Sequence, residues 1–342
     1  MTHHHARRTR RLVAVSAAVA AVALLVAGCT GTTPTDTKTP MTLRTEPNTK
    51  VFPGGLYLQA DSLAHQAAVR LAADGQESAS KAAAAIAETP VSIWLGDQYS
   101  AKKVGAVVAA NLAAAKKQGK TAVFVTYAIP NRDCGDFSAG GFSTAEYPTW
   151  MKAVTRALAR GEKRGEHSAV IVEPDSLAML SNCPSQTDTR IPLIRQSVKE
   201  LHDAGIPAYL DAGNSHWVQP AEMASRLKKA GIRYARGFFT NVASFYPVDD
   251  ERAYAEKVSN LTGGAKYVID VSRNGQGWKG TWCNPEGTGL GQAPHVSAGT
   301  TGLDALLWIK SPGVSDGTCN GGPKAGQWYA SYAEALVKNR RA

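Results

Sequence analysis

Two aspartates each follow a short apolar run that predicts a buried strand. Ser168–Val172 is almost entirely apolar, and Asp175 comes three residues after it. Thr121–Tyr127 has the same pattern, and Asp133 follows it in the next loop. Because the carboxyl ends of parallel strands meet at one rim of a barrel, we expect the two carboxyls to lie close together. A carboxyl among apolar neighbours and beside another acid keeps its proton near neutral pH, as a general acid requires.

A structural alternative is that Glu173 and Asp175 only cap the following helix. The second aspartate favours a carboxylate pair, and the two stretches resemble signatures of glycoside hydrolase family 6, the cellulases that include endoglucanases and cellobiohydrolases. Val125–Gly135 matches the pattern Val-x-Tyr-x-x-Pro-x-Arg-Asp-Cys-Gly. Val170–Leu177 matches a run of apolar residues that ends in Glu-Pro-Asp-Ser-Leu. Both patterns are long and specific.

The resemblance implies inverting hydrolysis of β-1,4-glucan, with no metal and no other cofactor. Asp175 would be the general acid, and Asp133 would raise its pKa by repulsion between like charges. Asp316 would be the base, acting through a chain of water molecules. Asp211 also ends an apolar strand, and we interpret it either as a supporting acid or as a structural group that bonds neighbouring loops.

The resemblance also assigns substrate-binding side chains, because sugar rings have apolar faces that stack on aromatic rings. The assigned residues are Trp94, Tyr127, Trp217, Asn241, Arg273, Trp282 and Lys310. Arg273 has two alternatives, a solvated loop position or a pairing with Asp316 that keeps this carboxyl ionised. Val314 departs from the family pattern, which usually has a glutamate two residues before the putative base. This departure puts affinity or specificity in doubt more than the chemistry.

Strand-like and helical segments alternate through most of the chain. The strand-like runs are Val91–Leu95, Thr121–Tyr127, Ser168–Val172, Pro207–Asp211, Arg233–Thr240, Lys266–Val271 and Ala305–Lys310. The helical stretches are Lys102–Lys117, Pro148–Arg164, Arg190–Ala204, Pro220–Ala230 and Asp249–Leu261. This alternation predicts a parallel α/β sheet, open or closed. The resemblance implies the closed form, a distorted seven-stranded parallel (β/α) barrel that is a variant of the TIM barrel.

The first 28 residues are interpreted as a lipoprotein signal peptide. Four arginines precede the apolar run Leu12–Ala27, and the run leads into a lipobox-like sequence that ends at Cys29. A lipid on Cys29 would be the protein's only attachment to a membrane; ordinary secretory cleavage is the alternative. Residues 29–50, rich in Thr, Pro and Lys, predict a flexible tether. Residues 51–342 are expected to form a single catalytic domain.

The charge of the chain limits its partners. The formal net charge is +10, and the leader supplies four arginines and no acid, so the remainder has 34 basic against 28 acidic residues. No long basic run alternates with aromatic residues, which disfavours binding to nucleic acid.

Apart from Cys29, the chain has four cysteines, at positions 134, 183, 283 and 319. An even number in an exported protein suggests two disulfides, although four cysteines allow three connectivities. Sequence order and the family resemblance favour Cys134–Cys183 and Cys283–Cys319. Metal binding is disfavoured because there is no Cys-x-x-Cys spacing.

We therefore expect an exported, monomeric endo-β-1,4-glucanase, either extracellular or held in the cell envelope as a lipoprotein. The short loop at Lys310–Asp316 favours an open cleft over the tunnel of an exo-acting cellobiohydrolase. A cell-surface glucan-binding lipoprotein with weak or no hydrolysis is the alternative from another functional class. Retention of the three aspartates argues against it.

Overall fold

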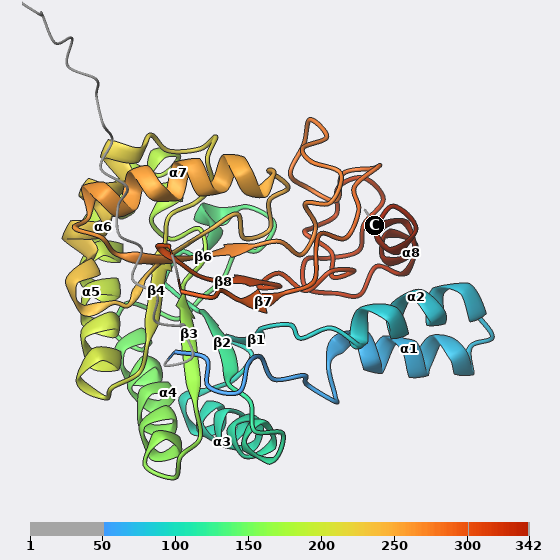
Figure 1. Ribbon diagram of the computed structural model, residues 1–342, viewed down its shortest axis with the longest axis horizontal. Coiled ribbons are helices and arrows are strands. Elements are labelled where there is room, and N and C mark those ends of the chain that lie inside the picture. The colour runs from blue at the N-terminus through green and yellow to red at the C-terminus, as the bar shows by residue number, and fades with distance from the viewer. Residues whose placement is uncertain (1–50, 300, 341–342) are drawn as a thin grey trace, which may run out of the picture. The chain divides into compact units, whose positions relative to one another are not determined.

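Seven parallel strands curl around a common interior (Figure 1). The computed structural model describes residues 51–299 and 301–340. The parallel strands are β1 (Ile93–Gly96), β2 (Ala122–Tyr127), β3 (Ser168–Val172), β4 (Ala208–Asp211), β5 (Gly237–Thr240), β6 (Lys266–Asp270) and β8 (Leu303–Leu307). They pair in this order, and the short β7 (His295–Val296) pairs with β8 in the antiparallel sense. The predicted distorted barrel is confirmed, with one short strand that was not predicted.

The two edges of the parallel sheet approach each other just beyond β8. Ser92 N donates a hydrogen bond to Trp308 O at 2.9 Å, immediately before β1 begins. Trp94 Nε1, within β1, donates to Ile309 O at 2.8 Å. These two bonds connect the ends of the sheet and give it the character of a barrel.

The strands are buried on both faces, which explains their nearly continuous apolar sequences. Side chains alternate along each strand, so every strand contributes to two apolar clusters. In β2, Val123 and Val125 belong to the inner cluster, whereas Ala122 and Phe124 pack toward the helices. Tyr209 from β4 and Phe239 from β5 contribute large side chains to the inner cluster, which fills the barrel interior.

Five helices lie between successive strands and cover the outside of the barrel (Figure 1). They are α3 (Ala101–Lys117), α4 (Tyr147–Glu162), α5 (Thr187–Asp203), α6 (Pro220–Ala230) and α7 (Val248–Leu261). Before β1 come α1 (Leu63–Ala73) and α2 (Glu77–Ala87), and α2 packs against α8 (Ala330–Lys338), which follows β8. Helices α3 to α7 match the five predicted stretches. Gly231 ends α6 with φ of 90°, the left-handed conformation that favours glycine at this position.

The structure corrects the sequence analysis at several places. Helices α1, α2 and α8 were not predicted, and the buried faces of α1 and α2 consist mainly of alanine, which gives a weak periodic signal. The predicted strand Arg233–Thr240 is too long, because Ile232–Tyr234 forms a 3-10 turn and β5 begins at Gly237.

The signal peptide, the Cys29 anchor and the tether lie outside the described residues. Of the helices that the structure describes, none combines the length and the apolar character needed to cross a membrane.

Candidate active site

The loop after β3 presents two acidic side chains in different environments. Glu173 and Asp175 have positive φ angles of 49° and 69°, which are uncommon for residues other than glycine. Glu173 is fully buried, and its Oε2 accepts hydrogen bonds from Ala128 N at 2.9 Å and Ile129 N at 3.0 Å. Glu173 therefore fixes the loop after β2 and does not cap a helix. Asp175 remains partly exposed at the same rim.

The loop after β2 carries the second aspartate. Asp133 has φ of 57°, and its Oδ2 accepts a hydrogen bond from Ser138 N at 2.8 Å. The preceding Arg132 donates to Tyr127 O at 2.7 Å and to Asp97 Oδ1 at 3.0 Å, which fixes the start of the loop. Burial, followed by repulsion from Asp136, raises the pKa of Asp133 above its ordinary value.

The surroundings of Asp175 favour its protonated form. Burial has the largest effect, and the negative charges of Asp211 and then Asp133 add to it, so the pKa of Asp175 is raised well above its ordinary value. Lys310 and Arg190 oppose this shift without cancelling it. The repulsion expected from Asp133 is present, but burial and Asp211 contribute more. The carboxyl can therefore hold a proton near neutral pH, as a general acid requires.

Asp211, at the end of β4, fixes the loop that contains Asp175. Its Oδ2 accepts hydrogen bonds from Leu177 N at 2.9 Å and Ala178 N at 2.8 Å. Its Oδ1 accepts a third from Gly213 N at 3.0 Å. Asp211 thus has the loop-bonding contacts that the sequence analysis offered as one alternative, and its charge also acts on Asp175.

Asp316, in the loop after β8, lies between two cations. Its Oδ2 accepts from Arg273 Nη1 at 2.7 Å, and its Oδ1 lies 2.8 Å from Lys310 Nζ. Asn284 N donates to the same Oδ2 at 3.0 Å. Burial alone would raise the pKa of Asp316, but Arg273 and Lys310 outweigh burial and lower it to about 2. The predicted pairing with Arg273 is confirmed, and the carboxyl stays ionised.

Two predicted sugar-binding side chains are engaged with the protein itself. Besides Asp316, Arg273 donates to Ala243 O at 2.7 Å and lies 4.5 Å above the ring of Phe245. Asn241 is buried, and its amide donates to Tyr246 O at 3.1 Å and Asp270 O at 3.0 Å. In the structure both support neighbouring loops, and their contacts with sugar stay predictions.

The predicted aromatic platforms lie on loops and strand ends of the same rim. Trp94 and Tyr127 meet edge to face, with ring centroids 5.1 Å apart. Burial, followed by the charges of Asp175 and Asp133, raises the pKa of Tyr127 well above its ordinary value. Trp217 is partly exposed, and its Nε1 donates to Asn182 Oδ1 at 3.2 Å.

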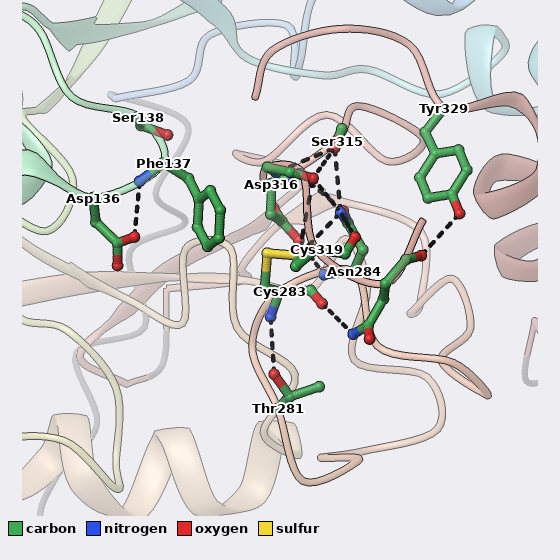
Figure 2. Close-up of a disulfide and its surroundings, with 12 residues drawn as sticks. Asp136, Phe137, Ser138, Thr281, Cys283, Asn284, Ser315, Asp316, Cys319 and Tyr329 are labelled. Atoms are coloured by element: carbon green, nitrogen blue, oxygen red, sulfur yellow. Dashed lines mark hydrogen bonds between the residues drawn. A yellow bond between two sulfur atoms is a disulfide. The ribbon is translucent and has the colours of Figure 1, made fainter. Parts of the chain in front are cut away.

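Phe137 connects the acid-bearing loop to the opposite side of the rim (Figure 2). Its centroid lies 5.9 Å from that of Trp282, which is 41% exposed. A Cβ atom at Gly317 would come within 2.5 Å of the Phe137 ring, so only glycine fits beside it. The loop that carries Asp133 therefore touches the loop that carries Asp316.

Both predicted disulfides are present, Cys134–Cys183 and Cys283–Cys319. The first joins the loops that carry Asp133 and Asp175, and the second joins the loop that carries Asp316 to the loop after β6. Figure 2 shows the second one beside Asn284, which exchanges hydrogen bonds with Asp316: Asp316 N donates to Asn284 Oδ1 at 2.9 Å, and Asn284 N donates back to the carboxylate.

Sequence reasoning missed Arg190, which contacts both acid-bearing loops. The side chain is almost fully buried, and it donates to Ser176 O at 3.3 Å and to Asn131 O. It lies on α5 and was counted only as part of a helical stretch. Its position directly before the apolar helix residues Ile191 to Ile194 was the available signal, because an arginine beside buried apolar residues needs polar partners when it is buried with them.

Comparison with known proteins places these features in a family. The model of the glycosyl hydrolases family 6 matches residues 55–340. Endoglucanase A of Cellulomonas fimi is 43% identical over 256 residues, which cover 75% of this chain and 56% of the relative. Endoglucanase 1 of Streptomyces halstedii is 36% identical over 296 residues, which cover 83% of this chain and 88% of the relative. The chain thus spans little more than half of the first relative's length.

Solved structures give the same result. The endoglucanase Cel6 of Mycobacterium tuberculosis, solved in complex with a thio-linked cellobioside, is 38% identical with a TM-score of 0.76. The match covers 87% of this chain and 98% of that structure. The catalytic core of the cellobiohydrolase Cel6A of Chaetomium thermophilum is 26% identical with a TM-score of 0.71, covering 84% and 97% of the two chains. The chain described here belongs to glycosyl hydrolase family 6.

Proposed function

We propose that the protein is an endoglucanase that hydrolyses internal β-1,4-glucosidic bonds with inversion. The observation that carries this proposal is the partly exposed Asp175, whose pKa is raised at a rim that also holds Asp133 and Asp316. The endo mode is supported by the relatives at 36–43% identity, which are named endoglucanases, whereas the cellobiohydrolase core is 26% identical.

Asp175 donates its proton to the oxygen of the leaving sugar. The carboxylate of Asp133 stabilises the positive charge that develops on the ring, and water attacks from the opposite face. A pKa of about 2 makes Asp316 a weak base in the free enzyme. We assign it the base role through a relay of water, strengthened when a sugar hydroxyl draws Lys310 away and removes one of its two ion pairs.

The glucan chain lies across the rim and stacks on aromatic rings. Trp94 and Tyr127 contact it near β1 and β2, Trp217 on the side of β4, and Trp282 from the loop after β6. Their partial or high exposure supports this assignment. An aromatic face covers the apolar face of a sugar while hydroxyls at its edge keep hydrogen bonds.

Two disulfides support export, because such bonds persist in oxidising compartments. We further propose that the signal peptide is cleaved before Cys29 and that this residue carries the lipid. Two or more acyl chains are needed for firm membrane attachment. Replacing Cys29 by alanine should move the protein from the membrane fraction to the medium, or leave the precursor uncleaved. Identical fractionation of the two forms would exclude the anchor.

Hydrolysis of carboxymethylcellulose tests the activity and its mode. An endo enzyme lowers the viscosity steeply while it releases few reducing ends. An exo enzyme releases many reducing ends while the viscosity falls only slightly. Asp175→Asn should lower the rate about 10²–10⁴-fold, the usual contribution of a general acid. Binding of glucan without release of reducing sugar by the wild-type protein would favour the glucan-binding alternative.

A further inference from the structure

A row of three stacked rings lies at the rim, outside the residues assigned above. The rings of His216 and Tyr246 are 4.1 Å apart at an interplanar angle of 12°. Those of Tyr246 and Trp278 are 5.2 Å apart at 11°. Trp278 is 40% exposed although Tyr246 covers one of its faces.

The three rings come from the loops that follow β4, β5 and β6, so they lie at the carboxyl ends of these strands. This is the rim that carries the candidate acids. The row is connected to the catalytic region through Phe245, the neighbour of Tyr246 in sequence, whose ring lies beneath Arg273. Arg273 in turn bonds Asp316.

The central ring of this row is held firmly by its backbone. Tyr246 N donates to Asn241 Oδ1 at 3.2 Å, and Tyr246 O accepts from Asn241 Nδ2 and Asn274 Nδ2, both at 3.1 Å. On its other side, His216 Nδ1 lies 2.8 Å from Ser215 Oγ. A ring supported in this way presents a flat surface at little cost in conformational entropy on binding.

We propose that Trp278 is an additional sugar-binding platform, which takes a glucosyl unit of the glucan chain away from the bond that is cleaved. Tyr246 stacks on Trp278, and the exposed part of the indole stays available for stacking on a sugar ring. Here the outermost ring is among the most exposed large apolar side chains of the described residues. The platform extends the side of the rim where Trp217 lies, away from Trp94 on β1. It rests on the proposed function, because its ligand is the same polysaccharide.

The length of the oligosaccharide substrate distinguishes a sugar-binding platform from a purely structural role for Trp278. We compare kcat/KM of the wild type, Trp278→Ala and Trp278→Phe on cellotriose, cellotetraose, cellopentaose and cellohexaose. Trp278→Ala should equal the wild type on the shortest substrate that is cleaved and lose about tenfold on the longest, which corresponds to about 1.4 kcal/mol. Trp278→Phe keeps a stacking face and should recover most of the loss.

Tyr234→Ala is the matched control. Tyr234 is a partly exposed aromatic residue just before β5, at the opposite ends of the strands. Its removal should not change how kcat/KM depends on chain length. Affinities for the same oligosaccharides, measured by calorimetry in the Asp175→Asn background, should show the same length dependence for Trp278→Ala.

Two results would overturn the platform while leaving the proposed function intact: an equal loss on every length, or no loss on any. If the wild type neither binds nor cleaves any cello-oligosaccharide, the proposed function itself is wrong, and the platform is wrong with it.

Discussion

Arg273 Nη1 lies 2.7 Å from Asp316 Oδ2, and the side chains of both residues are almost inaccessible to solvent. A buried guanidinium needs its counterion, because removal of one partner leaves an uncompensated charge in a medium of low polarity. The same carboxylate also accepts from Lys310 and from a backbone amide. Asp316 therefore has a structural role as well as the catalytic role proposed for it.

Asp316→Ala should lower the free energy of unfolding by about 3–5 kcal/mol, because Arg273 would stay buried without a counterion. Urea unfolding at pH 7 measures this change. Glu77→Ala is the control, since Glu77 pairs with Lys81 on the exposed surface and such pairs contribute at most about 1 kcal/mol. Equal stability of Asp316→Ala and the wild type would contradict the buried pair.

The same carboxyl predicts a loss of stability in acid. Its folded pKa of about 2 lies below that of an unfolded aspartate, about 3.9. Its contribution is therefore complete above the unfolded value and disappears as the pH falls through about 2. The stability difference between the wild type and Asp316→Ala should accordingly shrink between pH 4 and pH 2.

Asp175 predicts the opposite dependence. Its pKa is raised in the folded protein, so ionisation opposes folding increasingly as the pH rises from the unfolded value through the folded one. Asp175→Asn should therefore melt at a higher temperature than the wild type at pH 7, with the difference vanishing near pH 3. Thermal unfolding at the two pH values tests this, with Asp61→Asn as an exposed control. A variant that is less stable at pH 7 would contradict the raised pKa.

Arg190 should act as a positioning residue for the acid. Its guanidinium joins the backbone of both acid-bearing loops, and its charge opposes the raised pKa of Asp175. Arg190→Met should lower kcat and move the alkaline limb of the pH profile of kcat/KM upward, because a positive charge beside Asp175 is lost. Arg190→Lys keeps the charge without the planar fork, so it should lower kcat while leaving the limb in place.

An unchanged alkaline limb in Arg190→Met would mean that the residue supports only the fold. The disulfide Cys134–Cys183 links the same two loops and should keep both variants folded. Far-ultraviolet circular dichroism of each variant checks this before the kinetics are compared.

The sequence predicted the parts of the fold and site that depend on local patterns. All seven parallel strands followed from apolar runs, because burial on both faces leaves a continuous signal. Asp133 and Asp175 followed from their place after such runs. The alanine-lined faces of α1 and α2 gave no comparable signal. The contacts of Arg190, Glu173 and Asn284 could not be predicted, because they join residues that are 14 to 59 positions apart and depend on how loops meet in space.

The stereochemistry of the product provides the strictest test of the mechanism. An inverting site must place a water molecule between acid and base, which requires carboxyls about 6.5–9.5 Å apart, whereas about 5–5.5 Å indicates retention. Asp175 lies in the loop after β3, and Asp316 lies in the loop after β8. Ion pairs with Arg273 and Lys310 fix the position of the Asp316 carboxylate. A proton NMR time course on cellohexaose should therefore show the α-anomer of the new reducing end first, before mutarotation produces the β-anomer. Early β-anomer would overturn the inverting mechanism even if endoglucanase activity were established.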